Sequence, residues 1–208
     1  MPLTDQDNQI TIIFDIGGVL LDWNPRYLYN KIFDNDESRI NHFLQVICPQ
    51  EWNAKQDAGY PIAKAVEERV ELYPDFEPQI RAYYGRWEEM LMGEIKGSVK
   101  ILSDLRQVGY PLCALSNWSA ETYQRVKNKY EFFQWFDEIL ISGSVKVIKP
   151  DQAIFELLLD RIQRPADQCL LIDDSEQNLV VAEQLGFQTI QFSSPERLLT
   201  DLHQRNIL

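Results

Sequence analysis

Cysteine, histidine and positive charge are all scarce in this sequence. Its 208 residues include only three cysteines and two histidines. Cys48, Cys113 and Cys169 have none of the close spacing that marks a metal site, and the last two lie in strand-like runs where we expect small buried hydrophobic residues. Lysine and arginine number 20 against 32 acidic residues, a formal net charge of -12. This balance argues against nucleic acid or an anionic membrane as a partner.

Long hydrophobic runs are missing as well. The longest apolar candidate is interrupted by Asp15, so no segment approaches the ~20 residues that cross a bilayer. The opening residues, MPLTDQDNQI, lack the basic start and apolar run of a secretory signal. We therefore expect a cytoplasmic protein with a small-molecule partner. The sequence makes no prediction of its oligomeric state.

Strand-like and helix-like segments alternate in the second half of the chain. The apolar runs PLCAL, EILIS, CLLI and FQTIQF are separated by helical patterns, and TIIF forms a further run at residues 11–14. Gly109 is placed to end one helix, while Pro150 and Pro195 are placed in the first turns of two others. This alternation predicts an α/β fold, a Rossmann-like parallel sheet with helices on both faces.

Residues 24–96 have a different pattern, with helix after helix and no convincing strand. Near their end, Ile80, Tyr83, Tyr84 and Trp87 recur at helical spacing, which is typical of a packed helix face. We therefore predict an α/β core formed by residues 1–22 and 98–208. An all-helical cap at residues 23–97 would interrupt this core just after its first strand.

Polar residues follow several of the predicted strands. Taken singly, each has an ordinary explanation as a turn, a helix cap or a solvated charge. In open parallel sheets, however, ligands bind beyond the carboxyl ends of the strands, so these residues would share one edge. They are Asp15, Ser116, Asn117, Lys149, Asp173 and Asp174.

Three carboxylates at one edge repel one another unless a cation neutralises them. Carboxylate oxygens are the ligands that Mg²⁺ prefers in proteins. Together, the metal and Lys149 would create a positive pocket in an acidic protein. Such a pocket would hold a phosphoryl group, with Ser116 among its hydrogen-bond donors.

The ordered motifs FDIGGVL, ALSNW, KPDQAIF and LIDDSEQN resemble those of the haloacid dehalogenase superfamily of hydrolases. Most members of that superfamily are Mg²⁺-dependent phosphatases. The resemblance covers nearly the whole chain, and the insert after LLDW is similar in position to the helical caps of the family. It implies a hydrolase that removes phosphate from a small phosphorylated metabolite.

The resemblance also implies roles for the acidic residues. Asp15 would be the nucleophile that forms an aspartyl-phosphate intermediate. Asp15, the Gly17 carbonyl and Asp174 would ligate Mg²⁺. Asp173 would be either a further ligand or a partner behind the ligands.

Three more residues take roles from the same resemblance. Ser116 and Asn117 would bind the transferring phosphoryl group, and Lys149 would steady the nucleophile and the developing charge. Asn178 stands where many relatives carry another acid, which would weaken the affinity for Mg²⁺.

Gly17 departs from the family pattern, whose usual first motif has a second aspartate at this position. That aspartate protonates the leaving group, a contribution of ~10²–10⁴-fold in rate. One explanation is a substrate that leaves without help, such as an anomeric sugar, acyl or aryl phosphate. In a second, a group of the cap or a bound water supplies the proton, and in a third the protein binds phosphorylated ligands and hardly turns them over. The first two together are favoured.

Two other protein classes, one an enzyme and one a signalling module, fit the sequence less well. A 2-haloacid dehalogenase needs no acid for its halide, but the Asp173 and Asp174 pair would then be unexplained repulsion. A signalling receiver module carries its acidic pair with the first strand, the reverse of the order here. A catalytically weak phospho-ligand-binding protein of the same fold remains an alternative. Candidate substrate contacts in the cap are Arg26, Tyr27, Trp52 and Lys55.

Overall fold

The structure is a computed structural model that describes residues 9–208, so the first eight residues of the predicted core lie outside it. Its main sheet has the strand order β5-β4-β1-β6-β7, and every neighbouring pair is parallel. The predicted Rossmann-like parallel sheet is therefore confirmed. The strands are β1 (Thr11–Phe14), β4 (Leu112–Ser116), β5 (Glu138–Ile141), β6 (Cys169–Asp173) and β7 (Gln188–Gln191).

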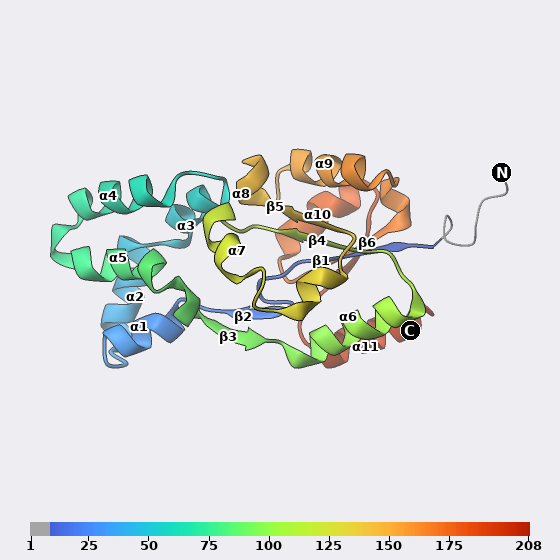
Figure 1. The fold of residues 1–208 in the computed structure, drawn as a ribbon, viewed down its shortest axis with the longest axis horizontal. Helices are drawn as coiled ribbons and strands as arrows, with labels where there is room; N and C mark the ends of the chain where they lie inside the picture. Colours follow the sequence, from blue (N-terminus) through green and yellow to red (C-terminus); the bar gives the residue numbers. More distant parts are fainter. Residues whose placement is uncertain (1–8) are drawn as a thin grey trace.

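Helices cover both faces of this sheet (Figure 1). Ile12 and Phe14 belong to the apolar cluster that includes α6 (Lys96–Val108) and α11 (Pro195–Gln204). Ile13 belongs to a second cluster, with α9 (Gln152–Ile162) and α10 (Glu176–Gln184). Successive strand residues point to opposite faces, so β1 contributes to both layers. All three cysteines are buried and free, which confirms the prediction of burial for Cys113 and Cys169.

The helix boundaries mostly follow the sequence signals. Gly109 ends α6 in a left-handed conformation (φ 96°), and Pro195 opens α11. The expectation for Pro150 is wrong, because α9 begins at Gln152 with the Asp151 side chain accepting from the Ala153 N–H at 2.9 Å. The remaining core helices are α7 (Ala120–Val126) and the short α8 (Ser142–Val145), with 3-10 turns at Glu131–Trp135 and Ala166–Gln168.

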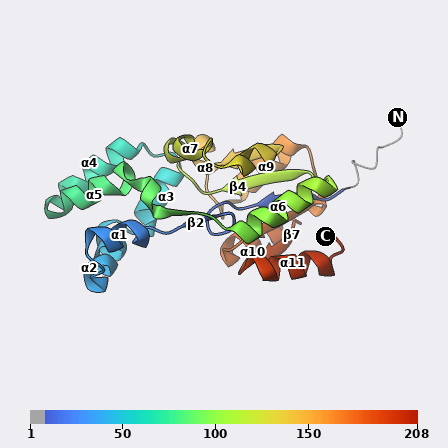
Figure 2. The ribbon, with the colours of Figure 1, turned by 60° about the horizontal axis from the view of Figure 1, so that its bottom comes forward.

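Residues 24–90, here called the helical insert, form a separate group of helices beyond one end of the sheet, as both ribbon views show (Figures 1 and 2). Its α-helices are α1 (Arg26–Ile32), α2 (Glu37–His42), α3 (Gln50–Asp57), α4 (Ile62–Leu72) and α5 (Glu77–Gly85). A π-helical turn at Phe43–Ile47 and 3-10 turns at Pro74–Phe76 and Trp87–Met90 complete it. The exact division into core and cap stays a prediction.

The expectation of no strand within residues 24–96 is wrong. A strand, β3 (Leu91–Glu94), pairs antiparallel with β2 (Leu21–Trp23) and forms a two-stranded ribbon between the sheet and the insert. The sequence LMGE is too short and too mixed to indicate a strand by itself. Its conformation depends on a partner about seventy positions earlier in the chain.

Aromatic packing fills the helical insert. Ile80, Tyr83 and Tyr84 are buried on α5, and the ring of Trp52 meets that of Tyr83 edge-on at a centroid distance of 5.1 Å. The predicted packed face of this helix is therefore confirmed.

Within residues 9–208, no helix has both the length and the apolar character needed to cross a bilayer.

Polar contacts hold the insert against the core at α7. The Glu121 carboxylate accepts a hydrogen bond from the backbone N–H of Ile62 at 2.9 Å. The Arg125 guanidinium donates to the backbone carbonyl of Tyr84 at 2.6 Å. Both contacts join a core helix to the insert, which fixes the insert over the carboxyl end of the sheet.

Candidate active site

The three central strands deliver the acidic and hydroxyl residues to one edge. Asp15 directly follows β1, Ser116 is the last residue of β4, and Asp173 is the last residue of β6. Because these strands are adjacent and parallel, their carboxyl ends meet at the same edge. The structure thus brings together residues that are about a hundred and sixty positions apart in the sequence.

Three carboxylates form a compact cluster at this edge. Asp15, Asp173 and Asp174 each place one oxygen within 4.8 Å of the others, with Asp174 exposed and the other two buried. A Cβ atom at Gly18 would lie 2.5 Å from Oδ2 of Asp174, and Gly18 has a φ of 76°. Glycine is therefore required where the loop after β1 approaches Asp174. Carboxylate oxygens are hard donors of the kind that fits Mg²⁺.

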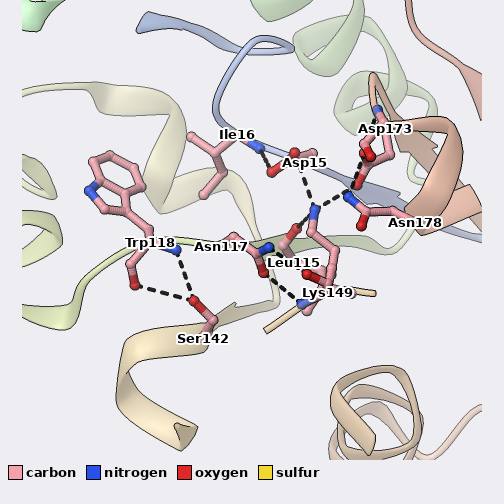
Figure 3. A network of polar contacts seen from close by, with 10 residues as sticks. Asp15, Ile16, Leu115, Asn117, Trp118, Ser142, Lys149, Asp173 and Asn178 are labelled. Atoms are coloured by element: carbon pink, nitrogen blue, oxygen red, sulfur yellow. Dashed lines mark hydrogen bonds and ion pairs between the residues drawn. The ribbon is translucent and has the colours of Figure 1, made fainter. Parts of the chain in front are cut away.

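Lys149 inserts its ammonium group between two of these acids (Figure 3). Its Nζ atom lies 2.6 Å from Oδ2 of Asp173, 3.2 Å from Oδ2 of Asp15 and 2.8 Å from the carbonyl oxygen of Leu115. Burial lowers the pKa of Lys149, but the two carboxylates outweigh this effect and raise it overall. The lysine therefore stays a buried cation.

Opposing effects act on the pKa of the Asp15 carboxyl. Burial is the largest cause that raises its pKa, and the charges of Asp173 and Asp174 add to the increase. Lys149 and a hydrogen bond with Ser116 act in the opposite direction. A divalent cation at the cluster would favour the ionised form, which is the form that acts as a nucleophile.

Asn117 uses its side-chain amide to hold the backbone of Lys149. Its Oδ1 atom accepts from the Lys149 N–H at 2.7 Å, and its Nδ2 atom donates to the Lys149 carbonyl at 2.8 Å. Both ends of the amide are thus engaged. The predicted contact between the Asn117 side chain and a phosphoryl group stays a prediction, whereas its positioning of Lys149 is visible in Figure 3.

Asp173 is surrounded by donors on both oxygens. Its Oδ1 atom accepts from the Ser175 N–H and from Nδ2 of Asn178, each at 2.9 Å, while Oδ2 faces Lys149. Asn178, which departs from the family's acidic residue, therefore makes a neutral hydrogen bond to Asp173. Of the two roles left open for Asp173, this geometry favours the partner that orients Lys149.

A cavity of about 70 Å³ lies beside the cluster, between the sheet edge and the helical insert. The core contributes Gly17, Ser116 and Asn117 to its lining, and the insert contributes Asn53, Asp57, Tyr84 and Trp87. The lining differs from the contacts expected from sequence, which were Arg26, Tyr27, Trp52 and Lys55. Asn53 and Asp57 are four residues apart on α3, a spacing that puts both on one helix face. The four-residue spacing of Asn53 and Asp57 was the feature of the sequence from which a polar wall of the cavity could have been predicted.

Trp118 is both a wall of the cavity and a packing residue. It lines the cavity, and its ring lies 5.5 Å from that of Trp87 of the insert. Its indole N–H donates to Oγ1 of Thr122 at 3.0 Å. The loop after β4 is thereby fixed from both sides.

Comparisons of the sequence with known proteins agree on one family. The sequence model of the haloacid dehalogenase-like hydrolases matches residues 11–186. A phosphorylated carbohydrates phosphatase of Thermotoga maritima is 24% identical over 182 residues, which covers 86% of this chain and 82% of the relative.

Solved structures share the fold. A HAD family enzyme of Bacteroides thetaiotaomicron superposes with a TM-score of 0.69 at 25% identity, covering 90% of this chain and 95% of the other. Another structure of that enzyme contains magnesium and inorganic phosphate. The L-2-haloacid dehalogenase of Xanthobacter autotrophicus superposes with a TM-score of 0.61 at 16% identity, covering 96% and 84%.

Proposed function

The chain belongs to the haloacid dehalogenase-like hydrolases, and from that premise we propose that it is a Mg²⁺-dependent phosphatase of a small phosphorylated metabolite. One observation carries the proposal. Asp15, Asp173 and Asp174 converge within 4.8 Å of one another, and Lys149 is paired with the first two. A site with this charge pattern accepts a cation and then a phosphoryl dianion.

The metal would be held by Asp15, the carbonyl of Gly17 and Asp174. When bound, Mg²⁺ supplies positive charge that orients and neutralises the phosphoryl oxygens. The second oxygen of Asp15 attacks phosphorus and forms an aspartyl phosphate, which water then hydrolyses. The Ile16 N–H, which donates to Oδ1 of Asp15 at 2.6 Å, holds the carboxylate in orientation for this attack.

The neighbouring residues assist the transfer of the phosphoryl group. Lys149 stabilises the charge that develops on the phosphoryl oxygens, because its ammonium group is fixed by Asp173 and the Leu115 carbonyl. Ser116 is 2% exposed and would donate its hydroxyl hydrogen bond to a phosphoryl oxygen. The backbone around Asn117 would supply the other donors.

The cavity supports a small substrate with a polar organic part. Its lining combines the aromatic rings of Trp23, Trp87 and Trp118 with the polar groups of Asn53, Asp57 and Asn117. The Thermotoga maritima relative is named for phosphorylated carbohydrates, which supports a sugar phosphate or another phosphate with a good leaving group.

Dehalogenation is the second candidate, because the Xanthobacter autotrophicus enzyme shares the fold. Displacement of halide needs no metal, however, and the Asp174 carboxylate beside Asp15 and Asp173 would then have no cation to neutralise it. Chelation separates the two activities. Dehalogenase activity would survive EDTA, whereas phosphatase activity would be lost.

The deciding experiment is a panel of phosphorylated metabolites and 4-nitrophenyl phosphate, assayed with Mg²⁺ and with EDTA. The Asp15→Asn protein serves as the blank, since its amide cannot form the phosphoenzyme. We expect phosphate release that requires both Mg²⁺ and Asp15. Turnover that persists in the Asp15→Asn protein would overturn the proposal, and ligand binding without turnover would favour the binding-protein alternative.

A further inference from the structure

Gly17 leaves the loop after β1 without a side chain to protonate a leaving group. We propose that the carboxyl of Asp57, on the helical insert, supplies this proton and acts as the general acid of the reaction. The inference rests on the proposed phosphatase function. It assigns a catalytic role to a residue outside the core motifs.

The end of α3 is tied directly to the loop that lines the cavity. Oγ of Ser142 donates to the backbone carbonyl of Asp57 at 2.6 Å and accepts from the Trp118 N–H at 2.9 Å. One hydroxyl group therefore joins Asp57 to the residue that follows Asn117. The Ser142 and Trp118 half of this link is visible in Figure 3.

Two glycines allow the backbones to meet at this point. A Cβ atom at Gly143 would lie 2.4 Å from the backbone nitrogen of Ala120 and 2.8 Å from the carbonyl oxygen of Trp118. A Cβ atom at Gly59, whose φ is 85°, would lie 3.0 Å from the carbonyl oxygen of Gly143. The chain after α3, the helix α8 and the loop after β4 are thus in close contact. This contact fixes Asp57 beside the phosphoryl site.

The Asp57 side chain is partly buried and lines the same cavity as Gly17 and Ser116. Its Oδ2 atom accepts from Nδ2 of Asn53 at 2.7 Å. Oδ1 of Asn53 in turn accepts from the hydroxyl of Tyr84 at 2.9 Å, which sets the orientation of the Asn53 amide. Neutral donors therefore hold a carboxyl group at the wall of the cavity that Gly17 and Ser116 also line.

The environment of Asp57 favours the protonated form of its carboxyl group. Burial raises its pKa from 3.8 to about 7, and a backbone hydrogen bond from Ser119 opposes this increase. An acid whose pKa lies near the working pH is the most effective proton donor. The hydrogen-bond donors to Asp57 are the Asn53 amide and the Ser119 backbone, both uncharged.

The elements around Asp57 carry four further titratable side chains. Tyr83 and Tyr84 of α5 have pKa values raised well above the ordinary value of 10, mainly through burial. On α7, Glu121 is held by the Ile62 N–H, and after α8 Lys146 lies against Gly59. Both phenols therefore keep their protons near neutral pH and are uncharged neighbours of Asp57.

With Asp57 in this role, every proton in the reaction has a donor and an acceptor. As Oδ of Asp15 bonds to phosphorus, the bond from phosphorus to the leaving oxygen breaks and its electron pair stays on that oxygen. The Asp57 carboxyl gives its proton to this oxygen, and the alcohol departs. In the second step the Asp57 carboxylate takes a proton from the attacking water, the bond from phosphorus to Asp15 breaks, and phosphate is released.

The test compares leaving groups in the wild type and in Asp57→Asn. An alkyl phosphate that the wild type hydrolyses needs its leaving oxygen protonated, whereas 4-nitrophenolate leaves as the anion. We expect Asp57→Asn to slow phosphoryl transfer from the alkyl substrate by ~10²–10⁴-fold, while the rapid burst of 4-nitrophenolate keeps its wild-type rate. The decline of kcat/KM for the alkyl substrate above about pH 7 should also disappear.

Gly17→Asp should restore the activity that Asp57→Asn loses. A Cβ atom at Gly17 meets no atom within 4 Å, so a side chain can begin there without a clash, and the double variant Gly17→Asp/Asp57→Asn should regain most of the alkyl activity. Equal losses on both substrates, or no loss on either, would overturn the role of Asp57. Absence of Asp15-dependent turnover in the wild type would instead overturn the proposed function, so the two failures are distinct.

Discussion

Nζ of Lys149 lies 2.6 Å from Oδ2 of Asp173, and both side chains are almost completely buried. Their charges compensate each other at a place that water does not reach. Removing one partner from such a pair leaves an uncompensated charge in the interior, which costs far more than losing an exposed pair.

We therefore expect Lys149→Met to destabilise the protein by about 3–5 kcal/mol in urea unfolding without Mg²⁺. The double variant Lys149→Met/Asp173→Asn should recover part of that loss, because the unpaired charge is also removed. Lys100→Met is the matched control, since Lys100 pairs with Asp104 at the same distance of 2.6 Å on the surface. Its cost should stay below about 1 kcal/mol. Equal costs for the two lysine variants would contradict the buried pairing.

Mg²⁺ should stabilise the folded protein through the carboxylate cluster. A ligand that binds only the native state at a hundred times its Kd adds about 2.7 kcal/mol. We expect Mg²⁺ to raise the melting temperature of the wild type and to have little effect on Asp174→Asn. Asp75→Asn, which changes an exposed carboxyl on the helical insert, should respond as the wild type does. A similar Mg²⁺ response in all three proteins would rule out this site.

Asp57 should make the stability depend on pH. Its pKa is raised from 3.8 to about 7 in the folded state, so the native protein binds this proton more tightly than the unfolded chain does. The resulting stabilisation is fully present below about pH 4 and is lost as the pH rises to about 7. Because the asparagine side chain does not titrate, Asp57→Asn should gain stability relative to the wild type over this range. At about 1.4 kcal/mol per pKa unit, the gain is at most about 4 kcal/mol.

Unfolding curves of both proteins from pH 4 to pH 8 would measure that difference without any assay of activity. The Asp75→Asn protein again serves as the comparison, and its difference from the wild type should not change with pH. A difference for Asp57→Asn that is also independent of pH would show that Asp57 titrates at its ordinary pKa.

The two neighbouring glycines should respond differently to alanine. Gly18 has a φ of 76° and its Cβ would lie 2.5 Å from Asp174, whereas Gly17 has free space. We expect Gly18→Ala to cost at least about 1 kcal/mol from backbone strain and to weaken the Mg²⁺ response by displacing Asp174. Gly17→Ala should be within about 0.5 kcal/mol of the wild type. Comparable effects of the two variants on melting temperature would be the contrary result.

Much of the core could be predicted because its signals are local. Each buried strand is an apolar run, and Gly109 and Pro195 mark a helix end and a helix start within one turn. The strand β3 could not be predicted, since LMGE becomes a strand only by pairing with residues 21–23. The start of α9 differs from the expectation for a local reason, because Asp151 rather than Pro150 caps the helix.

The order of the motifs was sufficient to gather Asp15, Lys149, Asp173 and Asp174, since parallel strands deliver their carboxyl ends to one edge whatever the details of packing. The sequence by itself thus determined the sheet and the identity of the residues at its edge. Only the tertiary structure decided that Asn117 holds the backbone of Lys149 and that Asp57 lines the cavity. Those placements depend on how a separate group of helices docks on the sheet, and docking is set by contacts between residues far apart in the chain, which leave no periodic signal along it.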